Sequence, residues 1–170
     1  MEITFYVAAV IAVLATLMVI VERSAVHALL YLIVSLLAVA VVFYVLGAPF
    51  AAALEVIIYA GAIMVLFVFV MMMLNLGDAS AAARTRGWLS PAMWIGPAIM
   101  AAALLAELAY LLTYGGRTLA GTGEVSSKAV GMALFGPYLL GVELASMLLL
   151  AGLVGAYHLG RHRYADHVED

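Results

Sequence analysis

The sequence predicts an all-α polytopic membrane protein with five transmembrane helices. Three observations support this prediction: hydrophobic residues make up 68% of the 170 residues, only 10% are charged, and the apolar residues gather in five long runs. Soluble domains carry about 25% charged residues, so a chain this apolar cannot cover its surface with polar groups. The net charge of −3 and the lack of a basic face also argue against a nucleic-acid partner. The lipid bilayer is the expected surrounding.

The first three runs lie at about residues 3–21, 28–46 and 51–76, and each has the roughly 20 apolar residues that a bilayer-crossing helix needs. The first run follows Glu2 instead of a basic segment and is too long for the core of a cleavable signal. We therefore expect it to remain as a membrane helix. Polar residues at 22–27 and a Gly-Ala-Pro turn at 47–49 separate the three runs.

The last two runs lie at about residues 92–114 and 138–159. An apolar shoulder at 129–135 precedes the fifth run, and Gly136-Pro137 is expected to separate the two, since proline disfavours helix at the residue before it. All five runs are continuous and do not alternate apolar with polar residues, so transmembrane β-strands are a poor alternative. The loops are too short to fold alone, and we expect one membrane domain over 1–170.

Positively charged residues in short loops predict the orientation of the chain. Five spans place Arg117 and Lys128 on one side of the membrane. The other side receives the remaining five basic residues, which are Arg23, Arg84, Arg86, Arg161 and Arg163. The predicted topology therefore has the N-terminus outside, in the periplasm of a bacterium, and the C-terminus in the cytoplasm.

Three glutamates fall within the predicted spans, whereas every lysine and arginine lies outside them: Glu55, Glu107 and Glu143. A charged residue at the centre of a membrane helix costs on the order of 2.5–3.5 kcal/mol, and such residues normally mark ion or proton paths. The alternative is a neutral, protonated glutamate that is hydrogen-bonded to a neighbouring helix. These three carboxyls account for the whole formal charge, because the other acidic residues balance the basic ones.

Glu55 has the most informative surroundings of the three. Tyr59 follows one helical turn later on the same face, and Gly61 comes two residues after it. The neighbouring Val and Ile residues are β-branched, which weakens the preference for helix. A π-bulge or another local irregularity is therefore an alternative to a regular helix here.

Glu143 lies about two turns into the fifth predicted span, with Ser146 three residues later. Gly141 and Ala145 give this span a face that another helix can approach closely, and Ala8, Ala12 and Thr16 do the same in the first span. Glu107 lies near the outer membrane interface, within reach of water. His158 and His162 are spaced four residues apart, and an interfacial cation patch with nearby arginines is favoured over a metal site.

Motifs for nucleotide, flavin or cluster binding are missing from the sequence, and it has 0 cysteines. No glycine-rich phosphate loop, catalytic triad or zinc-binding helix motif is present. Any redox chemistry connected with this chain is therefore expected to occur in other chains, and we predict no catalytic, cofactor-binding or metal-binding residue in it.

The run ALEVIIYAGAIMVLFVFVMMMLNL at 53–76 closely resembles the third helix of the subunit J family of bacterial NADH-quinone oxidoreductase, which is respiratory complex I. Mitochondrial subunit 6 is the equivalent protein. Three further segments are similar to that family, so that the resemblance covers nearly the whole chain: AVHALLYLIVSLL at 25–37, WIGPA at 94–98 and KAVGMALFGPYLLGVELASMLLL at 128–150. The Glu-x3-Tyr-x-Gly spacing in the third run makes the resemblance specific. Glu107 and the tail after Arg163 match no part of the family pattern.

The resemblance implies a coupling role in a bacterial inner membrane. The complex oxidises NADH with FMN and iron–sulfur clusters in partner subunits, reduces a quinone, and pumps protons through other membrane subunits. The third helix resembles one that switches between a π-bulge and a regular α-helix. The matching positions are Tyr59, Gly61, Ala62, Ile63, Met64 and Val65, beside Glu55. The resemblance makes Glu143 a secondary polar site that faces a neighbouring subunit.

Two other functions remain as alternatives at this point. Related membrane segments occur in multisubunit cation/proton antiporters and in membrane-bound hydrogenases, which perform no NADH chemistry. A purely structural scaffold of helices is the third interpretation.

Overall fold

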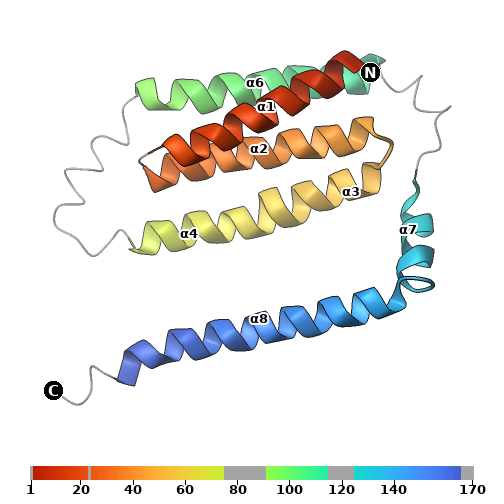
Figure 1. The fold of residues 1–170 in the computed structure, drawn as a ribbon. Helices are drawn as coiled ribbons and strands as arrows, with labels where there is room; N and C mark the ends of the chain where they lie inside the picture. The colour runs from red at the N-terminus through yellow and green to blue at the C-terminus, as the bar shows by residue number, and fades with distance from the viewer. Residues whose placement is uncertain (1, 23, 75–90, 115–124, 166–170) are drawn as a thin grey trace. The chain divides into compact units, whose positions relative to one another are not determined.

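The computed structural model describes residues 2–22, 24–74, 91–114 and 125–165, and these form helices and short turns with no strand among them (Figure 1). Five of the helices are long and apolar enough to cross a membrane, which confirms the predicted number of spans. The chain divides into two compact units, residues 1–125 and 126–170, and each is described by itself. The expectation of a single membrane domain stays a prediction.

The first unit is built around helix α2, Ala25–Val45, which packs against α1, Glu2–Val21, and against every other helix of the unit (Figure 1). Its core is made largely of small residues: Ala8 and Ala15 of α1 meet Val34, Ala38 and Val41 of α2. Small side chains let two helix backbones approach closely in a membrane. The predicted packing face of the first span is therefore present.

A polar link also joins α1 and α2 within their apolar contact. The hydroxyl oxygens of Thr16 and Ser35 lie 2.8 Å apart. The Thr16 hydroxyl donates to the carbonyl oxygen of Ala12 at 2.8 Å, and the Ser35 hydroxyl donates to the same carbonyl at 3.2 Å. Each hydroxyl thus has hydrogen-bond partners within the helix pair.

A tight turn connects α2 to the third span. Gly47 has φ +82, a left-handed conformation that glycine adopts at little cost. The amide of Gly47 donates to the carbonyl of Tyr44, and that of Ala48 donates to the carbonyl of Phe43. These two bonds form a Schellman cap, and Pro49 then opens the next helix at a position that proline favours. The direction of the chain is reversed within three residues.

The third span contains three helical segments in series. An α-helix, α3, covers Pro49–Leu54; a π-helix, η1, covers Glu55–Ile63; and α4 covers Met64–Leu74. In Figure 1 this span lies beside α2 along its length, in agreement with the contacts between α2 and all three segments.

Helix α6, Pro91–Tyr114, closes the first unit and contains Pro97 in its interior. Leu104 and Leu111 of α6 insert into the core between α1 and α2. At Gly96 the helix comes so near to α2 that a Cβ atom there would overlap the phenol oxygen of Tyr31. A side chain at Gly96 would therefore require the Tyr31 phenol to move.

The second unit contains α7, Ser127–Leu134, and α8, Leu139–Ala165. Ser126 caps α7 by accepting a hydrogen bond from the amide of Ala129 at 3.2 Å. The helix stops before Gly136-Pro137, which confirms the predicted break. None of the described residues of α8 is buried within its unit, including the small residues Gly141 and Ala145.

Candidate functional site

The π-helix in the third span is the main irregularity among the described helices, and it contains the predicted Glu55–Tyr59–Gly61 group. At its end the amide of Met64 donates to the carbonyl of Tyr59, five residues earlier, instead of four as in an α-helix. Such segments are rare and are often found at functional sites. The sequence left a regular helix and an irregular one as alternatives here, and the structure has the irregular form.

Gly61 helps to explain why the π-helix is tolerated at this place. A Cβ atom on Gly61 would lie 3.0 Å from the carbonyl oxygen of Val56, which is closer than most real Cβ contacts. Glycine avoids this contact, and the β-branched Val56, Ile57 and Ile58 before it have only a weak preference for the α-helix.

The π-helix begins four residues earlier than the segment Tyr59–Val65 that the sequence indicated. Glu55 is its first residue and is half-buried, whereas the Tyr59 side chain is 51% exposed. Ala62 and Ile63 complete the π-helix, and Met64 and Val65 already belong to α4. The Met64 side chain is buried while that of Val65 is exposed, so the junction between the two segments has one inward and one outward side chain.

Glu55 and Tyr59 are near each other in the sequence, but no hydrogen bond joins their side chains in the described part of the chain. The carboxyl of Glu55 is thus available to a water molecule or to a group from another chain. Its position at the first residue of the π-helix means that a change in helix type changes its register relative to Gly61.

Glu143 lies in the second unit, on α8, and is exposed there. The hydroxyl of Ser146 donates to the backbone carbonyl of Glu143 at 2.7 Å, and not to its carboxyl. No hydrogen bond is therefore seen between the side chains of these two residues, and the role of Glu143 stays a prediction.

Glu107 differs from what its position in the sequence indicates. Both carboxyl oxygens are buried, and neither has a hydrogen-bond partner among the residues that the structure describes. The side chain does not extend to water at the membrane interface, because the head group is turned toward the inside of the first unit.

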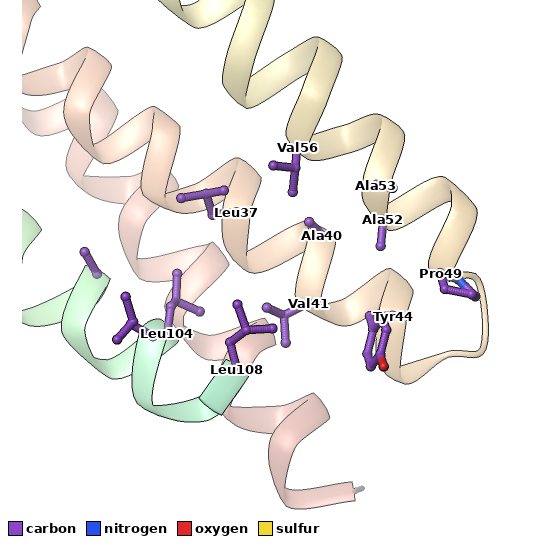
Figure 2. Close-up of a pocket in the computed structure, with 12 residues that line it drawn as sticks. Leu37, Ala40, Val41, Tyr44, Pro49, Ala52, Ala53, Val56, Leu104 and Leu108 are labelled. Atoms are coloured by element: carbon purple, nitrogen blue, oxygen red, sulfur yellow. The ribbon is translucent and has the colours of Figure 1, made fainter. Parts of the chain in front are cut away.

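An apolar pocket of about 460 Å³ lies between α2, the start of the third span and α6 (Figure 2). Its walls include Leu37 and Val41 of α2, Ala52 and Val56 of the third span, and Leu104 and Leu108 of α6. Val56 belongs to the π-helix, so the pocket borders the irregular segment directly. Sequence reasoning could not find this pocket, since it depends on how three separate helices diverge.

His27 is buried near the start of α2. Its Nδ1 atom lies 2.9 Å from the hydroxyl of Ser24, and its ring meets the Trp94 ring edge to face with centroids 6.5 Å apart. Among the described residues, no group of three His, Cys, Asp or Glu side chains is arranged to hold a metal ion. The side chain of His162 lies outside the described residues.

Known proteins resemble the chain over nearly its whole length. Residues 15–159 match the family model described as NADH-ubiquinone/plastoquinone oxidoreductase chain 6. NADH-quinone oxidoreductase subunit J of Pseudomonas aeruginosa is 62% identical over 95% of this chain and 97% of its own length. Subunit J of Escherichia coli K12 is 59% identical over 99% of this chain and 91% of its own. Subunit J of Buchnera aphidicola subsp. Schizaphis graminum is 47% identical over 96% of this chain and 99% of its own length.

Proposed function

Because the chain belongs to the NADH-ubiquinone/plastoquinone oxidoreductase chain 6 family, which includes the bacterial subunit J proteins, we propose that its third span couples quinone reduction to proton translocation. The observation that carries this proposal is the π-helix at Glu55–Ile63, which holds an acidic residue, a tyrosine and a glycine inside a membrane span. Coupling over a distance requires an element with two conformations, and a membrane helix that converts between a π-helix and an α-helix is such an element.

The proposed event is the conversion of the π-helix to a regular α-helix. Removing one π-type turn shifts the register by one residue, which rotates the following side chains by roughly 100° about the helix axis. Met64 is buried and Val65 is exposed, so a rotation of this size exchanges which of them faces the interior. Residues on either side of Gly61 thereby open or close a path for water beside Glu55 and Tyr59.

Glu55 and Tyr59 supply the groups that hold and pass a proton on this path. The Glu55 carboxyl is half-buried and has no hydrogen-bond partner in the described part of the chain, so water can reach it when the path opens. Tyr59 offers a phenol that both donates and accepts a hydrogen bond. Glu143, exposed on α8, is proposed to meet a polar group of a neighbouring subunit.

The proposed setting is the inner membrane of a bacterium, with the N-terminus in the periplasm and the C-terminus in the cytoplasm. NADH, FMN, iron–sulfur clusters and quinone bind to other subunits, and the partners of this chain are the membrane and quinone-site subunits. The names of the three relatives reported above favour this setting over an antiporter or a hydrogenase, because each is a subunit of NADH-quinone oxidoreductase.

A variant of Gly61 separates a coupling role from a purely structural one. We expect Gly61→Val to lower quinone reduction by NADH and proton uptake into membrane vesicles, while the complex still assembles on a native gel. Gly160→Val is a matched control, since a Cβ atom at Gly160 meets nothing within 4 Å. Normal activity and pumping in an assembled Gly61→Val enzyme would mean that the third span is only a scaffold.

A further inference from the structure

Glu107 has a position on α6 that neither the proposed gate nor the family resemblance uses. The side chain lies between Leu104 and Leu111, the two leucines of α6 that are buried in the core. Both of its carboxyl oxygens are buried, and the part of the chain that the structure describes offers them no hydrogen-bond partner. The residue as a whole is only partly buried, so its carbon atoms are nearer to the surface than its oxygens.

This arrangement is the reverse of the one that long polar side chains adopt near a membrane surface, where the head group reaches outward. A carboxyl turned inward without a partner is stable only in its neutral form, because an isolated buried carboxylate loses its hydration without compensation. No lysine or arginine is present in α1 or α2, the two helices that pack against α6.

None of the titratable groups on the helices that pack against α6 serves as a positively charged partner for the Glu107 carboxyl. The helices packed on it carry these side chains: Glu2, Tyr6, His27, Tyr31 and Tyr44, with Glu22 just after α1. His27 and Tyr31 adjoin Trp94 and Gly96, and Gly96 is eleven residues, or roughly 16 Å along the helix, from Glu107. Glu55 and Tyr59 belong to the span on the other side of the apolar pocket.

We propose that Glu107 is a proton-binding site inside the membrane, distinct from Glu55, whose carboxyl holds a proton in the folded chain and exchanges it with water. The pocket provides the means of exchange. Its wall contains Leu104, Leu105 and Leu108, which are neighbours of Glu107 on α6. In the proposed exchange the side chain rotates until its carboxyl reaches the edge of this pocket. The proton leaves the carboxyl oxygen for water there and returns by the same route.

Infrared spectroscopy of the assembled oxidoreductase that contains the full chain tests this proposal. The spectrum of the Glu107→Gln enzyme is subtracted from that of the unaltered enzyme, at rest and without NADH. The expected difference is one C=O stretching band of a protonated carboxylic acid, which moves to lower frequency after transfer to D2O. The exposed Glu2 provides a matched control, because Glu2→Gln should remove the bands of an ionised carboxylate.

Two results would overturn the proposal. Loss of carboxylate bands in Glu107→Gln would show that the group is ionised. A carboxylic acid band whose frequency does not change after many hours in D2O would show that the proton does not exchange with water. Glu107→Leu gives a second measurement if the Gln variant assembles poorly: a neutral, unpartnered acid should be replaceable without loss of assembled complex, whereas an ionised and paired one should not. Because the spectra are taken without turnover, they do not depend on the proposed π-helix gate.

Discussion

A methyl group added at Gly61 would lie 3.0 Å from the carbonyl oxygen of Val56, five residues earlier in the same helix. The π-helix and the glycine are therefore linked by geometry: the wider turn brings a backbone oxygen to the place where a side chain would begin. In a regular α-helix the positions five residues apart diverge around the axis, and the same methyl group finds more room. A side chain at position 61 should thus favour the α-helical form.

Replacing Gly61 by Ala tests this link with the smallest change. Overpacking of this kind costs about 1–3 kcal/mol, which shifts an equilibrium between the two helix forms by roughly fivefold or more. We expect proton pumping per NADH oxidised to fall in Gly61→Ala and to fall further in Gly61→Val. Gly160→Ala, where the new methyl group meets nothing, should pump normally. Equal pumping by Gly61→Ala and Gly61→Val would show that the size of this side chain does not matter.

The Glu55 carboxyl is expected to act by changing its protonation. A glutamine side chain has nearly the same shape but cannot release or accept a proton, so Glu55→Gln should lower both quinone reductase turnover and pumping in assembled enzyme. An aspartate side chain keeps a carboxyl about one bond shorter, and Glu55→Asp should retain part of the activity. Steady-state rates in membrane vesicles provide the measurement. If the two variants were equally active, the carboxyl itself would have no role.

The contact between Gly96 and Tyr31 predicts an interaction between two substitutions. A Cβ atom at Gly96 would overlap the Tyr31 phenol oxygen, so Gly96→Ala should destabilise the packing of α2 on α6 by about 1–3 kcal/mol. Tyr31→Phe removes the oxygen and should restore part of the loss in the double variant. The amount of complex that survives stepwise heating measures each effect. Additive losses would contradict the contact.

The hydrogen bonds between α1 and α2 predict a smaller effect. Thr16→Val keeps the shape of the side chain but removes the hydroxyl that lies 2.8 Å from the Ser35 hydroxyl. Ser35 still has the carbonyl of Ala12 as an acceptor, so we expect a loss of about 0.6 kcal/mol, the mean for hydrogen bonds between membrane helices. Ser35→Ala should cost a similar amount, and the double variant should cost less than the sum. Thermal denaturation of the purified complex would resolve the three values.

Much of the architecture could be predicted because each membrane-spanning helix must by itself be long enough and apolar enough to cross the bilayer. Length and apolarity alone indicated five spans, and the alanine face of α1 indicated close packing. An irregular third span was one of two alternatives that the sequence allowed, since Gly61 among β-branched residues is a local property of the chain. These features depend on residues that are neighbours in the sequence.

The features that could not be predicted depend on contacts between helices. Glu107 is near the end of a span, and its carboxyl oxygens are buried on a helix whose Leu104 and Leu111 pack in the core with α1 and α2. The start of the π-helix at Glu55, four residues before the predicted segment, is likewise not encoded in a local motif. The pocket beside Val56 arises where three helices separate, so no single run of residues could indicate it.

The Schellman cap at Gly47 gives any motion of the third span a direction. The cap binds one end of the span to α2 only a few residues before the π-helix, so that end cannot turn freely. Converting a π-type turn to an α-type turn lengthens the axis by about one residue rise, roughly 1.5 Å, while it rotates the helix. With its Pro49 end fixed, the span would rotate and lengthen together. The displacement along the helix axis would occur at the Leu74 end, on the opposite face of the membrane from the turn.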